Sequence, residues 1–121
     1  MANQIKKSDR LETFTKYNGK CAYCGIDLNY SEMQIDHIIP RRRSEIHNDK
    51  IINGKNHILN YNPSCKSCNS SKSTFSIEDW RKQIKQKINS LRRDSSTFRI
   101  CERFNLVKVE NLDVIFYFEK V

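Results

Sequence analysis

Apolar residues at helical spacing predict a short helix near the start of the chain. Leu11, Phe14 and Tyr17 recur every three residues and would lie on one side of a helix. Ser8 has the side chain of a helix N-cap, and Gly19 is the type of residue that follows a helix end. We therefore expect a helix from Ser8 to Tyr17.

The clearest helical pattern begins at Ser76, where the sequence Ser-Ile-Glu-Asp has the form of a capping box. The apolar residues that follow at intervals of three or four are Ile77, Trp80, Ile84, Ile88 and Leu91. The basic residues on the other side are Arg81, Lys82, Lys85 and Lys87. The pattern predicts an amphipathic helix with one face on a core. A second short helix is expected over residues 97–104.

Two segments have the composition of strands. Residues 33–39 are rich in isoleucine and end before Pro40, and residues 114–118 alternate and contain aromatic residues. Residues 41–62 are polar and lack sustained periodicity, which predicts a long loop with at most one further strand at residues 51–52. Together these elements predict an α+β fold with little sheet.

Composition limits the core and indicates the partner. The chain has 121 residues, of which 37% are hydrophobic and 30% charged. We therefore expect one domain over residues 1–121, with a small apolar core that needs a support such as a bound metal. Lysine and arginine number 22 against 14 acidic residues, which gives a net charge of +8. This excess favours a polyanion, with nucleic acid ahead of an anionic membrane surface.

The chain has no stretch close to the roughly 18 apolar residues of a membrane span. Residues 1–4 are polar and show no signal-peptide pattern. We therefore expect a cytoplasmic protein with no membrane partner. In that reducing compartment, paired cysteines are more often metal ligands than disulfides.

Two C-x-x-C pairs supply four thiolates, which is the ligand set of a tetrahedral structural zinc. The pairs are Cys21 with Cys24 and Cys65 with Cys68. Their separation by 40 residues exceeds that of a zinc finger, so the metal should hold a larger insertion. Two redox dithiols or four ordinary buried cysteines are the alternatives. Cys101 has no partner nearby and is expected in the core.

Polar residues form a second pattern around the cysteine pairs. The segment Asp36-His37-Ile-Ile-Pro40 precedes Asn60, which stands five residues before the third cysteine, and the fourth cysteine precedes Asn69 and Lys72. In this order the motifs resemble the zinc-bearing branch of the HNH endonuclease family, over about residues 14–75.

The resemblance implies a ββα-metal nuclease fold, in which a bent β-hairpin and a helix surround one catalytic metal beside a zinc knuckle. A helical extension over about residues 76–121 would end in a strand. The resemblance assigns Asp36 and Asn69 as ligands of the catalytic metal and His37 as general base. It assigns Asn60 as the residue that braces the loop and helps to orient the histidine.

Phosphodiester hydrolysis accounts for these residue types without the family name. A base must take a proton from water near neutral pH, and the imidazole pKa of about 6.5 suits His37 to this task. A hard cation must balance charge on the phosphate and the leaving 3′ oxygen, and Asp36 and Asn69 offer oxygen ligands. Many relatives have histidine in place of Asn69, so this H-N-N variant should prefer magnesium or manganese.

Basic residues near the motif are candidates for DNA contact. Arg41, Arg42 and Arg43 stand where many relatives carry a glycine pair. A solvated charge run is the alternative, but we expect phosphate contact because they follow the catalytic strand in a basic protein. Lys72 shares a helix face with Asn69 and is expected to contact phosphate or the metal's bound water.

Some positions remain open at this point. Neighbours on a regular strand point to opposite faces, so Asp36 and His37 can share one site only if the strand bends or bulges at its end. Tyr23 could stack on a base or pack on the zinc site. His47 and His57 match no motif position and are expected at the surface, with substrate contact as the alternative.

The expected function is metal-dependent cleavage of DNA, most simply double-stranded, by a bacterial or phage-encoded protein. The main alternative is a catalytically inactive zinc-ribbon module that binds nucleic acid. A protein-interaction zinc domain is a third reading, which the net charge of +8 disfavours. The sequence leaves open whether the protein is a monomer or a homodimer, and whether it nicks DNA or cuts both strands.

Overall fold

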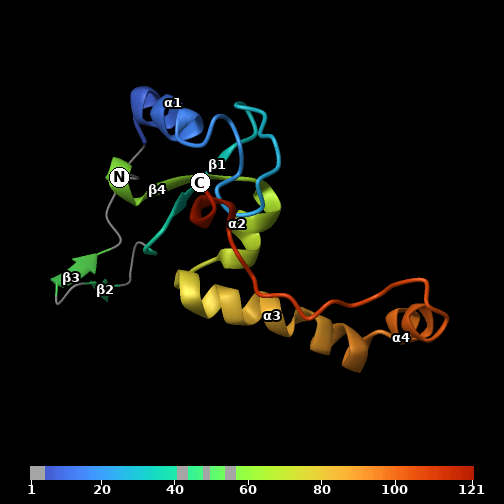
Figure 1. The fold of residues 1–121 in the computed structure, drawn as a ribbon. Coiled ribbons are helices and arrows are strands. Elements are labelled where there is room, and N and C mark those ends of the chain that lie inside the picture. The colour runs from blue at the N-terminus through green and yellow to red at the C-terminus, as the bar shows by residue number, and fades with distance from the viewer. Residues whose placement is uncertain (1–4, 41–43, 48–49, 54–56) are drawn as a thin grey trace. The chain divides into compact units, whose positions relative to one another are not determined.

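The computed structural model describes residues 5–40, 44–47, 50–53 and 57–121 (Figure 1). The chain divides into two compact units, residues 1–77 with 115–121 and residues 78–114. All the motifs of the predicted active site belong to the first unit.

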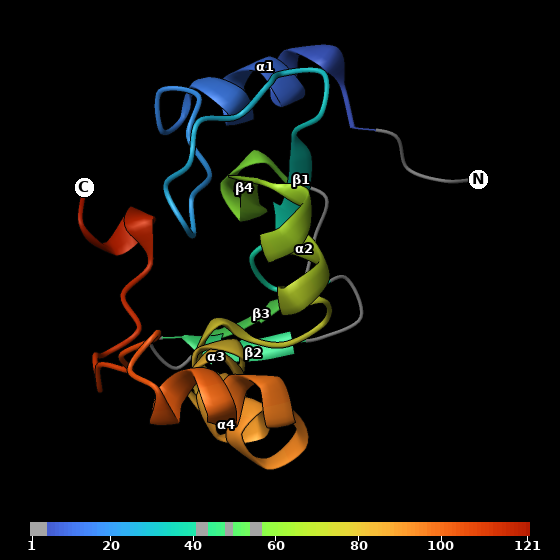
Figure 2. The same cartoon turned by 90° about the vertical axis from the view of Figure 1, so that its right-hand side faces the viewer.

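A two-stranded antiparallel sheet and a helix form the centre of the first unit. Strand β1 (Gln34–His37) pairs with strand β4 (Tyr61–Ser64). Helix α2 (Lys66–Lys72) follows β4 and packs against β1, and Figures 1 and 2 show the three elements side by side. The predicted α+β class and the ββα arrangement are therefore confirmed.

Helix α1 (Lys7–Thr15) packs against β4. The helix was predicted, but its predicted cap is wrong: the N-cap is Lys6, which makes no side-chain cap hydrogen bond, and Ser8 lies inside the first turn. After the helix, Gly19 has a φ of +76° and donates its N–H to the Phe14 carbonyl at 3.0 Å. Glycine adopts this left-handed conformation without strain, which explains its place at the helix end.

The segment predicted as a loop contains more structure than expected. Strands β2 (Ser44–His47) and β3 (Lys50–Asn53) pair antiparallel, and β3 includes the strand predicted at residues 51–52. The 3-10 helix η1 (Ile58–Asn60) leads into β4. Strand β4 was not predicted. It contains Pro63, and a proline argues against a strand because it has no N–H to donate. The proline is tolerated because β4 pairs with one strand in its two-stranded sheet.

The predicted strand over residues 114–118 is wrong. This segment has no regular structure until the 3-10 helix η2 (Tyr117–Glu119). The first two N–H groups of η2 donate to the carbonyls of Tyr23 and Ala22, at 3.0 and 2.8 Å. These acceptors belong to the tight turn of the first cysteine pair. Residues 114–118 therefore have no extended partner strand here with which to form a ladder of hydrogen bonds.

The second unit contains α4 (Ser96–Arg103) and all but the first residue of α3 (Ile77–Asp94), the two helices predicted there. The Ser95 hydroxyl caps α4 by accepting the Phe98 N–H at 3.1 Å. Cys101 of α4, expected in the core, is half-buried.

The interior of the first unit mixes apolar and polar side chains. Its buried hydrophobic residues include Cys21, Ala22, Tyr23, Met33, Ile39, Tyr61 and Phe116. Its buried polar residues include Thr13, Asp36, Asn62, Ser64 and Lys72. Buried charges are tolerated only when they are paired, so the buried side chains of Asp36 and Lys72 are expected to have partners of opposite charge. Within the described parts of the chain, no helix combines the length and apolar character needed to cross a membrane.

Candidate active site

The four predicted zinc ligands converge on one point. The sulfur atoms of Cys21, Cys24, Cys65 and Cys68 all lie within 4.8 Å of one another, and Cys24 Sγ is 3.8 Å from Cys65 Sγ. Four thiolates at about 2.3 Å from a tetrahedral zinc would be separated by about 3.8 Å. The cluster is therefore positioned to bind one metal ion, and its four sulfurs fit zinc.

Local hydrogen bonds favour the thiolate form of Cys21. The N–H of Cys65 donates to Cys21 Sγ at 3.4 Å, and the N–H of Cys68 donates to Cys65 Sγ at 3.3 Å. A hydrogen bond from Cys68 lowers the pKa of Cys21 to about 4, and the same hydrogen bond raises the pKa of Cys68. The second pair reaches this position because Cys65 is the N-cap of α2, which places Cys68 in the first helical turn.

Asp36 is 4% exposed and has protein donors on both carboxylate oxygens. The Tyr23 hydroxyl donates to Oδ2, and Lys72 Nζ lies 3.2 Å from Oδ2 and 3.4 Å from Oδ1. Burial raises the pKa of Asp36, while the Lys72 charge and the Tyr23 hydrogen bond act in the opposite direction. Burial, together with the Asp36 charge, raises the pKa of Tyr23 well above its usual value, so the phenol donates its proton at neutral pH.

Lys72 differs from the sequence expectation. Its side chain is fully buried, and its ammonium also donates to the carbonyl of His37 at 3.0 Å. The structure therefore does not present this side chain to a phosphate or to a metal-bound water at the surface. The physical reason is the buried charge of Asp36, which needs a nearby cation.

His37 is half-buried and is held through the backbone around it. Its ring meets the ring of Tyr61 edge to face, with centroids 5.3 Å apart. Asn60 Oδ1 accepts the N–H of Ile39 at 2.9 Å, and Asn60 Nδ2 donates to the Ile39 carbonyl at 3.0 Å. The Asn60 carbonyl also accepts the N–H of Ile38 at 2.9 Å. Asn60 thus braces the chain directly after the histidine.

Asp36 and His37 are neighbours at the end of β1, so the shape of the strand there decides which way their side chains point. The register is continuous, with Asp36 opposite Asn62 and His37 opposite Tyr61, so the described strand has no bulge at this point. On such a strand the two side chains face opposite sides. The chain leaves the strand after His37, at the residues that Asn60 holds.

Asn69 lies in the middle of α2 and is half-buried. It precedes Lys72 by three residues, so the two share a helix face. Because Lys72 reaches Asp36, this face is the one turned towards β1. Arg41, Arg42 and Arg43 lie outside the described residues.

Residues 21–75 match the HNH endonuclease family model. This part of the chain is an HNH endonuclease domain. The match includes both cysteine pairs, both strands of the central sheet and α2. Helices α3 and α4 lie beyond it.

Two proteins that are similar to this chain are longer than it. The chain is 34% identical over 102 residues to "SPbeta prophage-derived putative HNH endonuclease YoqL" of Bacillus subtilis, a match that covers 80% of this chain and 40% of YoqL. Among solved structures it is similar to the Type II-C Cas9 enzyme from Actinomyces naeslundii. That match has a TM-score of 0.52 and 27% identity, and covers 69% of this chain and 9% of the other. The chain therefore spans less than half the length of either relative.

Two polar residues of the HNH domain were not identified as site residues from the sequence. Asn62 is 1% exposed; its Nδ2 donates to the Tyr23 hydroxyl at 3.4 Å, and its Oδ1 accepts from Lys16 Nζ at 2.9 Å. For Tyr23, the sequence left two roles open, stacking on a base and packing on the zinc site. Asn62 lies opposite Asp36 because β1 pairs with β4. The turn that carries Tyr23 is joined to β4 by the N–H of Ala22, which donates to the Pro63 carbonyl at 2.8 Å. The sequence did not reveal either contact.

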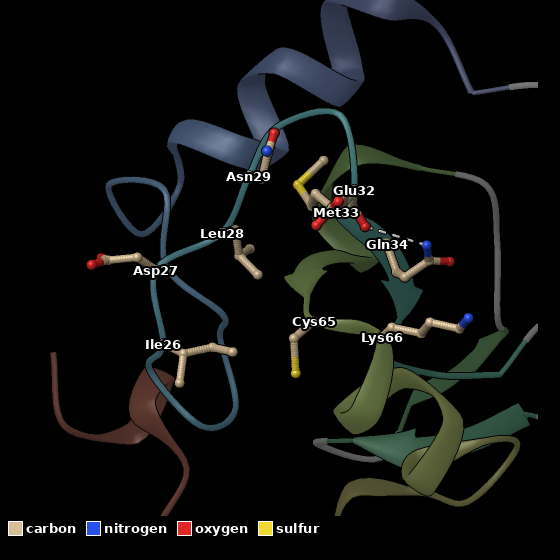
Figure 3. A pocket seen from close by; sticks show the side chains of 9 residues that line it. All are labelled: Ile26, Asp27, Leu28, Asn29, Glu32, Met33, Gln34, Cys65 and Lys66. Atoms are coloured by element: carbon tan, nitrogen blue, oxygen red, sulfur yellow. Dashed lines mark hydrogen bonds between the residues drawn. The ribbon is translucent and has the colours of Figure 1, made fainter.

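A hollow of about 500 Å³ lies beside the cysteine cluster rather than at the histidine (Figure 3). It is bounded by the segment 26–34 and by the start of α2, and Figure 3 shows Leu28, Met33 and Cys65 around it. Of the sequence-predicted site residues that the structure describes, its lining includes Cys65 alone. Asp36, His37 and Asn69 do not line this hollow, so it is not the place where their proposed chemistry would occur.

Loss of one thiolate should release the metal. We expect Cys68→Ser to lose bound zinc and to unfold the first unit, because a structural zinc contributes on the order of 10 kcal/mol to the folding of a small site. Zinc content per chain, measured by mass spectrometry, and thermal unfolding test this. Cys101→Ser, outside the cluster, is the control and should keep one zinc. Equal zinc content in wild type and Cys68→Ser would contradict the site.

Removing the Asn60 side chain should destabilise the domain. Asn60→Ala deletes both side-chain hydrogen bonds to Ile39, and leaving such groups unpaired costs about 1–3 kcal/mol. Urea unfolding measures the loss. Asn29→Ala is the matched control, since it also removes two hydrogen bonds, both to Ser31 in an exposed loop. A loss no larger for Asn60→Ala than for this control would argue against the bracing role.

Proposed function

We propose that this protein is a metal-dependent endonuclease that hydrolyses DNA phosphodiester bonds, with His37 as general base. The observation that carries the proposal is the fixed strand end of the HNH domain. Lys72 holds the His37 carbonyl, and Asn60 holds the residues that follow. An imidazole on a backbone held by two elements, α2 and η1, is suited to take a proton from a water beside the phosphate.

The proposed ligands of the catalytic cation are Asp36 and Asn69. Both offer oxygen, which matches the preference of magnesium and manganese. A carboxylate has about four lone-pair positions, so the donors Tyr23 and Lys72 leave Asp36 capacity for a cation. When bound, such a cation stabilises charge on the phosphate and on the departing 3′ oxygen.

The proposed substrate is double-stranded DNA. The HNH family match and the net charge of +8 both support a nucleic acid. Arg41, Arg42 and Arg43 remain proposed phosphate contacts. One active site per chain makes nicking the simplest activity of a monomer, whereas cutting both strands would indicate a homodimer or two successive events.

Cleavage of supercoiled plasmid with magnesium or manganese tests the function. The wild type should nick the plasmid, and His37→Ala should be slower by about 10²- to 10⁴-fold, the usual contribution of a general base. Both proteins should contain one zinc and bind the plasmid equally. His57→Asn is the matched control, because it replaces an exposed histidine and retains a side-chain acceptor for the Leu59 N–H.

The metal requirement is tested by leaving out the divalent cation, since a chelator would also remove zinc. Plasmid binding without cleavage by any of these proteins would favour the inactive zinc-ribbon module. Equal cleavage by the wild type and His37→Ala would exclude His37 as the base. A parallel assay on double-stranded RNA decides between the two nucleic acids.

A further inference from the structure

The tight turn from Cys21 to Cys24, here called the cysteine knuckle, places a tyrosine against the carboxylate of Asp36. Tyr23 lies between Cys21 and Cys24, is 3% exposed, and donates its hydroxyl proton to Asp36 Oδ2. The element that contains two of the metal-binding cysteines therefore also contacts Asp36.

The direction of this hydrogen bond follows from the groups around the phenol. A phenol has one proton to donate. Asn62 Nδ2 donates to the Tyr23 oxygen at 3.4 Å, so the proton of Tyr23 is directed to the carboxylate. Asn62 is itself fixed because Lys16 Nζ donates to its Oδ1 at 2.9 Å. With Lys72 on both oxygens, Asp36 is held by two elements, the knuckle and α2.

The packing of the Tyr23 ring does not explain why this residue is a tyrosine and not a phenylalanine. Its ring meets the rings of Phe116 and Phe118 edge to face, with centroids 5.6 and 6.0 Å away, contacts that phenylalanine would also make. A buried hydroxyl is costly without a partner, and here its acceptor is Asp36. The backbone at Tyr23 is held too, because its carbonyl accepts the Tyr117 N–H at 3.0 Å.

We propose that Tyr23 is a positioning residue through which the cysteine knuckle sets the orientation of Asp36 for the catalytic divalent cation. The inference rests on the proposed function, since it requires that Asp36 bind this cation. Groups that hydrogen-bond to a metal ligand fix its orientation, and their loss commonly weakens metal binding by about 10- to 100-fold.

The test is manganese binding to the zinc-loaded full chain, measured by the electron paramagnetic resonance signal of free Mn²⁺. Tyr23→Phe keeps the ring and removes the hydroxyl. We expect it to retain one zinc and to bind Mn²⁺ about 10- to 100-fold more weakly than the wild type. Raising Mn²⁺ should restore its plasmid cleavage. Tyr30→Phe, a partly exposed tyrosine away from this network, is the control and should match the wild type.

The outcomes separate this inference from the proposed function. If the wild type binds Mn²⁺ and cuts DNA while Tyr23→Phe binds Mn²⁺ equally well, the inference alone is overturned. If the wild type neither binds Mn²⁺ beyond its zinc nor cuts DNA, the proposed function fails and the inference fails with it.

If Tyr23→Phe loses zinc, a second measurement on the wild type tests whether Tyr23 positions Asp36. In the wild type, the Tyr23 hydroxyl proton should give a slowly exchanging NMR signal that shifts when Mg²⁺ is added. A missing signal, or one that Mg²⁺ leaves unchanged, would overturn the inference.

Discussion

Four cysteine thiolates at one point connect two parts of the chain that are far apart in sequence. One pair lies on the turn after α1, and the other lies at the start of α2. Few apolar side chains are buried among the residues of this unit that the structure describes, so a bound metal would supply much of its folding free energy. The paired strands β1 and β4 come between the two cysteine pairs in the sequence.

The buried ion pair between Asp36 and Lys72 has a different role from that of the metal cluster. Removing two charges from water is costly, and such a pair often adds little stability compared with apolar residues of similar size. Its benefit is orientation, because the Lys72 ammonium contacts both the carboxylate and the carbonyl of His37. One side chain from α2 thereby fixes two consecutive residues of β1.

A regular strand directs Asp36 and His37 to opposite faces, which is a problem for a site that uses both. Contacts from several elements hold this strand end: the knuckle through Tyr23, η1 through Asn60, and α2 through Lys72. The contacts of Tyr23 and Lys72 act on the carboxylate, and that of Asn60 acts on the backbone after the histidine. The proposed chemistry depends on these supports as much as on the two residues themselves.

Local patterns determined helices α1, α3 and α4, the strand before Pro40 and the ligand set of the cysteine cluster, because each depends on residues a few positions apart. Only the tertiary structure decided that Lys72 is buried, that Tyr23 and Asn62 adjoin Asp36, and that the segment before η2 is not a strand. Lys72 and Asp36 are 36 positions apart in the chain. Burial and pairing of this kind arise from contacts between distant residues, and no local pattern encodes them.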